Sequence, residues 1–554
     1  MTPIRPVRPR RARRPGRTAA ALVAVLALTA GCAASGAGSE QGNGKRQEGG
    51  DLTFLIDSLG DTWIPNNSAI SSFQGHIWGH VTDKLVYVDE EGTVSPWVAE
   101  EWEQNDDATE FTITLKDGVT FSDGSPVDAE AVVANLDIWA DGRPDEGINP
   151  IGLFPTTYES AEAVDPLTVK VSFSAPTLGF IPTLGYHGSI LISPETLALS
   201  AEEQADLSND IGSGPFTVKS WKEGDSVVLE KRDDYDWAPE ALDHAGPATL
   251  DTLTYKLVAE PSVRTAAVQS GQAQVAYNPS PQELGPFKEQ GYTVAAPRYL
   301  GFVNGFALNT QVAPFDDAKV RQAVQVGIDR DEILSTVYTE DWLPAESFIQ
   351  SNVPGASDHS DEFAFDPEAA KTLLDEAGWR AAGDGVRTKG GKKLTLTLYP
   401  NPYLATSQSI DELVAQQLGD LGFEVEIQAY DVVTYGEKVS FQNPSVPAYE
   451  VTRSFIDAGT VAGILTDTDG GEDWFNVGQG DPELTRLGNE VAGAISTEER
   501  EPVLDELQSY VLQQGYFVPL TQIVQRLYLQ SPKVKGVSYN GIAYANFYTA
   551  YLEG

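Results

Sequence analysis

The hydrophobic pattern of the chain alternates between strand-like and helix-like segments from about residue 51 onward. Residues 52–56, LTFLI, are apolar except for Thr53, which predicts a buried strand. Phe111, Ile113 and Leu115 alternate with polar residues, as expected for a strand with one exposed face. Further strands are predicted at 167–173, 216–221, 227–229, 253–255, 275–277, 394–398 and 423–427.

Helical patterns separate these strands. Residues 262–270 form a predicted helix closed by Gly271, and residues 317–329 carry apolar positions at helical spacing. Asp366 can cap a further helix with Pro367 at its first position, and Gly378 ends it. A last helix is predicted to end at Gly422. Such alternation predicts an α/β fold, but many enzymes and binding proteins share that class, so it does not decide function.

The N-terminus has the order of a secretory signal peptide. Seven arginines between residues 5 and 17 precede an apolar stretch at 18–30, and Gly31 and Cys32 follow. The apolar stretch would span only ~20 Å as a helix, short of the ~30 Å core of a membrane. Residues 1–31 are therefore a predicted signal peptide, and the Gly, Ser and charged residues of 32–50 predict a flexible tether.

Residues 28–32, LTAGC, resemble a bacterial lipobox. That resemblance implies that Cys32 becomes the first mature residue and carries a diacylglycerol. The alternative is an ordinary signal peptide with an incidental cysteine, because Thr29 stands where leucine is commoner. The arginine pairs leave both general secretory and twin-arginine export open.

Composition narrows the range of partners. The 81 acidic and 37 basic residues give a net charge of −44, which disfavours nucleic acid as a partner. The acidic excess either keeps a secreted protein soluble or attracts cationic ligands. Because Cys32 is the single cysteine, an intrachain disulfide and a cysteine-based zinc site are both excluded.

No sequence motif indicates catalysis. His76 and His80 would share a helical face and are a weak candidate metal pair, but HIWGH lacks the glutamate of a zinc-protease motif. Packing or cleft-lining roles are the alternative for both. The chain has no G-x-S-x-G elbow and no phosphate-binding G-x-x-x-x-G-K-[ST] loop, and GSGP at 212–215 is better interpreted as a turn. We therefore expect no catalytic residue, no cofactor and no enzyme activity.

Five segments, taken in order, resemble one protein family. They are IWGHVTDKLVYV at 77–88, WVAEEWEQNDDATEFTITLKDGVTFSDGSPVDAEAVVANL at 97–136, GSGPF at 212–216, FALNTQVAPFDDAKVRQAVQVGIDRDEI at 306–333 and DPEAAKTLLDEAGW at 366–379. The chain thereby resembles the dipeptide/oligopeptide/nickel-binding family of ABC transporter substrate-binding proteins, solute-binding protein family 5. The resemblance runs from about residue 51 to the end. The motif residues themselves are interpreted as fold determinants rather than ligand contacts.

The resemblance implies a type II periplasmic-binding-protein-like α/β fold, with two lobes around a cleft and an extra inserted domain. Ligand would bind between the lobes, which close by a hinge motion. The expected limits are 51–79, 207–295 and 515–554 for lobe I, 80–206 for the inserted domain and 296–514 for lobe II.

The implied function is that of an extracytoplasmic solute-binding subunit, lipid-anchored to the outer face of the cell membrane. Acting as a monomer, it would capture a small peptide-like solute and deliver it to an ABC permease and its ATPase. Three alternatives stay open: a binding protein for a nickel chelate or metallophore, a secreted lipoprotein hydrolase, and a peptide sensor or chaperone that presents its ligand to a receptor.

The resemblance also points to one ligand contact. YEVTRSFIDAG at 449–459 resembles a segment whose aspartate pairs with the α-ammonium of bound peptides, and Asp457 falls on that aspartate. Ser454 stands where an aromatic residue is common. Arg453 could instead neutralise Asp457 in a structural ion pair. Trp63, Trp474 and Phe302 are candidate aromatic walls of the pocket, or core residues.

Overall fold

The computed structural model describes residues 46–554, apart from 61, 70, 72, 339–341, 384, 440–442, 467–472 and 525. The predicted signal peptide, Cys32 and residues 32–45 of the predicted tether lie outside the described residues. Within the described part, no helix has the length and apolar character needed to cross a membrane.

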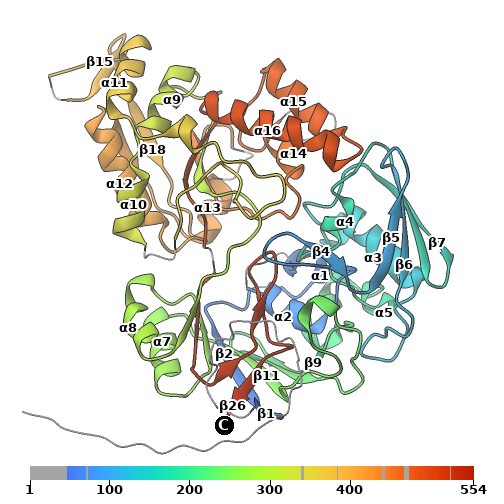
Figure 1. The fold of residues 1–554 in the computed structure, drawn as a ribbon. Helices are drawn as coiled ribbons and strands as arrows, with labels where there is room; N and C mark the ends of the chain where they lie inside the picture. Colours follow the sequence, from blue (N-terminus) through green and yellow to red (C-terminus); the bar gives the residue numbers. More distant parts are fainter. Residues whose placement is uncertain are drawn as a thin grey trace, which may run out of the picture. The chain divides into compact units, whose positions relative to one another are not determined.

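A mixed seven-stranded sheet forms the first of three main sheets (Figure 1). Its order is β13 (Thr293–Ala295), β22 (Tyr528–Gln530), β12 (Val275–Tyr277), β2 (Asp51–Ile56), β11 (Thr252–Leu257), β10 (Ser226–Lys231) and β9 (Phe216–Lys222). The apolar run at 52–56 forms β2, which lies between two parallel neighbours, β11 and β12. A strand in that position is covered on both faces, which explains why four of its six residues, Leu52, Phe54, Leu55 and Ile56, are apolar and buried. The strands predicted at 216–221, 227–229, 253–255 and 275–277 are confirmed in the same sheet.

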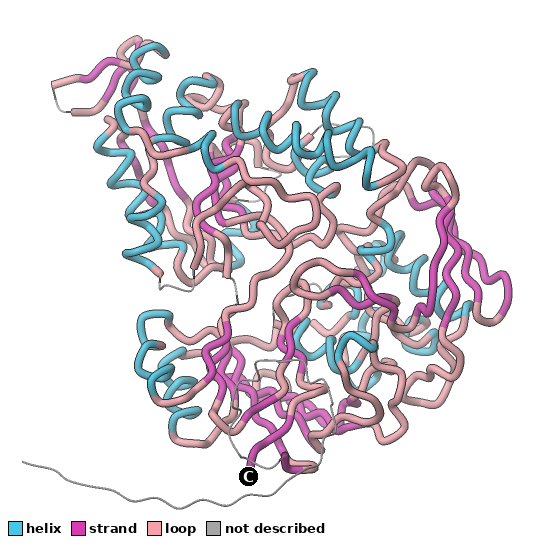
Figure 2. The backbone as a smooth tube through the Cα atoms, viewed as in Figure 1, coloured by secondary structure: helices cyan, strands magenta, loops and turns pink. Residues whose placement is uncertain are grey.

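A four-stranded antiparallel sheet is inserted in the sequence between β2 and β9. Its order is β5 (Ala99–Gln104), β6 (Glu110–Leu115), β8 (Thr168–Phe173) and β7 (Tyr158–Asp165). In Figure 2 these are the long magenta strands that run side by side. Phe111, Ile113 and Leu115 of β6 are buried, as their alternation predicts. Helix α3 (Ala129–Asp141) packs against β7 and β8, and the Asp128 side chain caps it by accepting from the Ala131 N–H.

A third group of elements surrounds a three-stranded sheet. The sheet has the order β20 (Ala448–Val451), β14 (Asn304–Leu308) and β21 (Phe517–Thr521), and a parallel pair, β18 (Thr395–Leu398) and β19 (Glu424–Ile427), belongs to the same half of the chain. The predicted cap is confirmed, because the Asp366 carboxylate accepts from two backbone N–H groups of α11 (Pro367–Glu376). The pattern at 317–329 forms α9 (Ala318–Val326). A second helix, α10 (Arg330–Val337), then begins at Asp329, whose side chain caps it.

The remaining elements are short or helical. The other helices are α1 (Pro65–Ser68), α2 (Gly75–Val81), α4 (Phe180–Thr183), α5 (Pro194–Leu197), α6 (Ala201–Gln204), α7 (Pro261–Gln269), α8 (Gly285–Glu289), α12 (Ser407–Asp420), α13 (Val432–Lys438), α14 (Thr460–Leu465), α15 (Pro482–Ala492) and α16 (Thr497–Gln513). The other strands are β1 (Arg46–Gln47), β3 (Val86–Val88), β4 (Val94–Pro96), β15 (Arg380–Ala381), β16 (Arg387–Lys389), β17 (Lys392–Lys393), β23 (Val534–Lys535), β24 (Ser538–Tyr539), β25 (Ala545–Asn546) and β26 (Tyr551–Glu553).

The domain limits inferred from the sequence stay a prediction. One pairing bears on them directly: β21 forms its ladder with β14 and not with the seven-stranded sheet. If lobe II ended at residue 514, the neighbouring strands β14 and β21 of the three-stranded sheet would belong to different lobes. We therefore propose that the last limit of lobe II lies after Thr521 rather than at 514.

Candidate functional site

A cavity of about 1010 Å³ lies between two stretches that are far apart in the sequence. One stretch comprises residues between 150 and 183, around α4 and the loops that flank β7 and β8. The other comprises residues between 453 and 500, which include α14 and the first turn of α16. Pockets for small ligands typically measure ~300–1,000 Å³. The cavity is thus large enough for a solute of several residues.

An ion pair between Asp457 and Arg500 forms part of the cavity wall. Asp457 lies in the loop between β20 and α14, and Arg500 lies on α16. The Arg500 Nη2 is 2.7 Å from Asp457 Oδ1, and Nη1 donates to Oδ2 at 2.9 Å. Their side chains are only 11% and 9% exposed. This two-pronged geometry is the strong form of a charge-assisted hydrogen bond.

Two glycines allow the Asp457 carboxylate to occupy this position. A Cβ atom added to Gly179 or to Gly459 would come within 2.7 Å of Asp457 Oδ2, closer than real Cβ contacts allow. Gly179 belongs to the 150–183 stretch, while Gly459 follows Asp457 in the same loop. The carboxylate is therefore in close contact with both stretches that line the cavity.

Arg453 supplies a second positive charge to the same cavity. Its guanidinium carbon lies 4.3 Å from the ring centroid of Trp474, a cation–π contact. Burial lowers the pKa of the Arg453 guanidinium. Within the described residues, its side chain forms no hydrogen bond and no ion pair. Among the described residues that line the cavity, the charged ones are Arg453, Asp457 and Arg500, and together they carry one positive charge in excess.

The Asp457–Arg500 pair also borders a second cavity, of about 490 Å³. That cavity is lined by Trp102 and Gln104 of β5 and by Glu501 and Leu504 of α16. Because both cavities share the pair and Leu178, the pair stands between two spaces that a longer solute could occupy.

The structure brings together two of the four predicted ligand-contacting residues. Asp457 and Trp474 line the same cavity. Trp63 and Phe302 contribute to neither of the two cavities. Trp63 is 5% exposed and packs edge-on against Trp78 and Trp221, with both ring centroids 6.2 Å away. Phe302 is fully buried, stacked on Phe517 and in contact with Phe455. These contacts favour the core alternative for both residues.

The predicted alternative for Asp457, a structural ion pair, is the arrangement observed, but its partner differs. Arg453 was the expected partner because it is close in sequence, whereas Arg500 lies 43 residues away. Nothing in the sequence marks Arg500 for this role, since it occurs among the charged residues of an amphipathic helix. Arg453 lies instead on the face of Trp474.

His76 and His80 lie on α2, apart from the two cavities above, and their contacts are structural. The His80 Nδ1 lies 2.7 Å from the His76 carbonyl oxygen, and Nε2 accepts a hydrogen bond from the Phe547 N–H at 2.9 Å. Burial lowers the pKa of His80 to about 4, so the ring is neutral at pH 7. The His76 Nε2 lies 2.9 Å from the Tyr528 hydroxyl. Across the described residues, no group of three or more His, Cys, Asp or Glu is arranged to hold a metal ion. The geometry therefore favours the packing alternative for this pair.

Comparison with known proteins gives a family match and a set of relatives. Residues 93–472 match the family model described as bacterial extracellular solute-binding proteins, family 5 Middle. The glutathione-binding protein GsiB of Pectobacterium atrosepticum is 30% identical over 338 residues, which cover 60% of each chain. GsiB of Salmonella paratyphi A is 30% identical over 354 residues, or 63% of each chain. The chain thus spans somewhat less than two thirds of the length of these curated relatives.

Solved structures share the fold over most of the chain. NikA from Brucella suis in complex with Fe(III)-EDTA superposes with a TM-score of 0.76 at 23% identity, covering 91% of this chain and all of that one. The oligopeptide-binding protein AppA from Bacillus subtilis, in complex with a nonapeptide, gives a TM-score of 0.75 at 22% identity, covering 92% and 100%. The predicted two-lobed α/β fold of the periplasmic-binding-protein type is confirmed by these likenesses.

Proposed function

We propose that this chain, which belongs to family 5 of the bacterial extracellular solute-binding proteins, captures a small peptide-like solute for import by an ABC transporter. Members of this family bind solutes for transport and are not enzymes, so the hydrolase alternative is set aside. The solute would be delivered to the permease and its ATPase. The chain would act as a monomer.

The observation that carries the proposal is the positive charge of the 1010 Å³ cavity. Among the described lining residues, Arg453 and Arg500 stand against a single carboxylate, Asp457, on a protein whose net charge is −44. A local cationic surplus in a partly buried cavity attracts an anionic group, because low dielectric strengthens the interaction. Peptides carry a terminal carboxylate, and the tripeptide glutathione, named in the relatives, carries two. We therefore propose a short peptide whose carboxylate contacts Arg453.

Asp457 keeps a proposed role in binding beside its structural pair. An ionised carboxylate has about four acceptor positions, and Arg500 occupies two of them. An ammonium group of the solute could donate to the remaining positions without displacing Arg500. Trp474 would contribute an apolar surface next to Arg453.

A second candidate ligand is an anionic metal chelate. The structural likeness to NikA in complex with Fe(III)-EDTA supports it, because that chelate carries carboxylates that the same arginine surplus would attract. In this case the chelating carboxylates would contact Arg453 and the metal would need no protein ligand. His76 and His80 would take no part.

The direct experiment identifies the solute and then tests its carboxylate. Native mass spectrometry of the protein purified from its own host should reveal a bound mass. Calorimetry then compares the peptide with its C-terminally amidated form, in the wild type and in Arg453→Met. Amidation should weaken binding to the wild type at least tenfold, about 1.4 kcal/mol. The loss of affinity on amidation should be much smaller in Arg453→Met. The exposed residue Arg380 provides the matched control, Arg380→Met. Equal affinity of the two peptide forms for the wild type would refute the proposed contact.

The proposed anchor is a lipid on Cys32, which would hold the protein at the outer face of the cell membrane. The order of basic, apolar and small residues before Cys32 supports it. Cys32→Ala should abolish labelling by radioactive palmitate and release the protein from the membrane fraction. Unchanged labelling and retention would contradict the anchor. Genes for permeases and ATPases beside this one would favour transport over the sensor alternative.

A further inference from the structure

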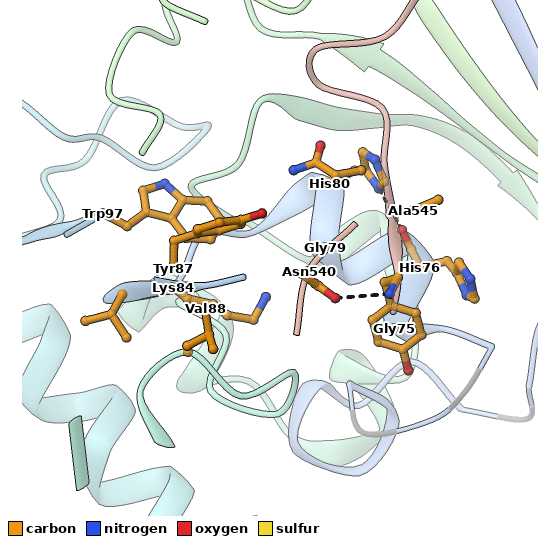
Figure 3. A pocket seen from close by; sticks show the side chains of 14 residues that line it. Gly75, His76, Gly79, His80, Lys84, Tyr87, Val88, Trp97, Asn540 and Ala545 are labelled. Carbon is orange, nitrogen blue, oxygen red and sulfur yellow. Dashed lines mark hydrogen bonds between the residues drawn. The ribbon is translucent and has the colours of Figure 1, made fainter. Parts of the chain in front are cut away.

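A second kind of pocket, small and enclosed, lies beside α2 (Figure 3). Its volume is about 30 Å³, and it shares no residue with the two larger cavities. It is lined by α2, by β3, by Trp97 and by the C-terminal segment around β24 and β25. A cavity needs ~10–15 Å³ to hold one water molecule. This pocket therefore has room for one small molecule or ion and little more.

The ammonium group of Lys84 lines this pocket and, among the described residues, has a cation–π contact but no hydrogen bond or ion pair. Lys84 is only 5% exposed. Its nitrogen lies 5.8 Å from the ring centroid of Trp97. Among the described residues, no hydrogen bond or ion pair reaches it. Burial lowers the pKa of Lys84 to about 8, so the amine is still mostly protonated at pH 7. The nearby Asp83 carboxylate opposes this shift without hydrogen-bonding to the amine, so an anionic group in the pocket would supply the direct contact that the ammonium lacks.

The two asparagines of the pocket present donors rather than acceptors. The Asn540 Oδ1 accepts hydrogen bonds from the backbone N–H groups of Ile542 and Tyr544, at 3.2 and 3.0 Å. The Asn546 Oδ1 accepts from the Tyr548 N–H at 2.9 Å. Because these bonds fix the orientation of each amide, the remaining group of each side chain is its NH₂. The pocket thus combines an ammonium with two amide donors.

No carboxylate offsets these donors inside the pocket. None of the described residues that line it is acidic. Asp83, the neighbour of Lys84, is bonded elsewhere: it accepts from the Tyr235 hydroxyl at 3.0 Å and from the Trp237 indole N–H at 2.8 Å. His80 lines the pocket, but both of its ring nitrogens are already engaged.

We propose that this pocket is a binding site for one small monovalent anionic group, held by Lys84, Asn540 and Asn546. The volume excludes a multi-residue ligand, and the donor set matches a halide or a single carboxylate. The anionic group could be an inorganic ion or the carboxylate end of a solute. In either case it would join the 84–97 segment to the C-terminal segment 540–546.

The test uses bromide and formate as probes. Crystals of the protein soaked in bromide should show an anomalous peak beside the Lys84 Nζ, and formate should occupy the same place. In solution, the wild type should broaden the ³⁵Cl resonance, and Lys84→Met should lose most of that broadening. Lys392→Met removes the same charge from an exposed strand and should leave it unchanged.

The results distinguish an inorganic anion from a solute carboxylate, and they can also refute the proposed site. A bromide peak that persists when the imported solute is bound identifies an inorganic anion site, while displacement by the solute identifies its carboxylate as the occupant. If crystals soaked at high concentrations of bromide or formate show only water in the pocket, the proposal is refuted. Broadening of the ³⁵Cl resonance that survives in Lys84→Met would also refute it. Should Lys84→Met fail to fold, the soaked wild-type crystals alone decide the question.

Discussion

Replacing either Asp457 or Arg500, which breaks their ion pair, should destabilise the folded protein. The two side chains are 9% and 11% exposed, so each charge would remain largely buried after its partner is removed. Removing one partner of a buried ion pair typically costs ~3–5 kcal/mol, because an uncompensated charge is left behind. We expect Asp457→Asn and Arg500→Met each to lower the free energy of unfolding by about 3 kcal/mol, at the lower end of that range, because some exposure remains.

A double-mutant cycle isolates the pair. With both changes present no buried charge is left alone, so the double variant should lose much less than the sum of the single losses. Pairs in direct contact show coupling of ~0.5–3 kcal/mol, and this two-pronged geometry should lie near the top of that range. The assay is chemical denaturation of the ligand-free protein. Single losses that add to within ~0.5 kcal/mol would refute the reasoning.

A surface pair provides the control for this cycle. Lys319 and Glu376 approach to 2.7 Å, but their side chains are 45% and 54% exposed. Exposed pairs contribute ~0–1 kcal/mol, so the same cycle at this site should give little coupling. Gly179→Ala offers an independent check, because its methyl group would meet Asp457 Oδ2 and displace the carboxylate without removing any charge.

Binding separates the structural role of Asp457 from its proposed ligand role. If the solute's ammonium group contacts Asp457, then Asp457→Asn should weaken the affinity for an amine-bearing ligand by ~2–5 kcal/mol. Arg500→Met leaves the carboxylate in place and should weaken that affinity less. An affinity that stays within about threefold in Asp457→Asn, below ~1 kcal/mol, would show that Asp457 is not the anchor.

Three further outcomes are expected. Adding the imported solute should close the two lobes and reduce the radius of gyration in solution scattering, and a saturating solute that leaves the curve unchanged would contradict hinge closure. Replacing His76 and His80 with Gln should leave nickel affinity unchanged in calorimetry, since the contacts of these residues are structural; loss of tight nickel binding would favour a metal site. Burial and the neighbouring Glu450 raise the pKa of Asp411, so the folded protein holds that proton more tightly than the unfolded chain. Stability should therefore fall as pH rises from the ordinary aspartate range through the raised pKa, and Asp411→Asn should flatten this dependence in denaturation curves measured at several pH values.

The local elements were predictable because their signals are local. The run at 52–56 is apolar at every position except Thr53 because β2 lies between two parallel strands. Asp366 and Pro367 form the start of a helix through contacts within one turn. The segment 517–521, which the sequence analysis placed with lobe I, instead forms β21 beside β14. Its partner, β14, is more than 200 residues away, and no local pattern records that pairing.

The candidate site was only partly predictable for the same reason. The segment at 449–459 marked Asp457, and Trp474 followed from its place in the chain, because both belong to one short region. Arg500 reaches Asp457 only because α16 packs near the loop after β20, and Gly179 approaches from a stretch almost 280 residues earlier. Trp63 and Phe302 show that a position near a predicted cleft does not by itself identify a ligand contact. An aromatic residue near a predicted cleft has the same sequence signature whether it faces the ligand or the core.

The net charge of the chain does not predict the charge of its individual cavities. A net charge of −44 suggested either a solvated surface or attraction of cations. Yet the described residues of each proposed binding cavity carry an excess of positive charge: Arg453 and Arg500 against Asp457 in one, and Lys84 with no acidic lining residue in the other. Exposed charges are screened beyond ~8–10 Å at physiological salt, whereas a buried arginine or lysine acts at contact distance in a low dielectric. We therefore expect the acidic surface to contribute to solubility, while the cations that line the cavities would select the proposed anionic ligand.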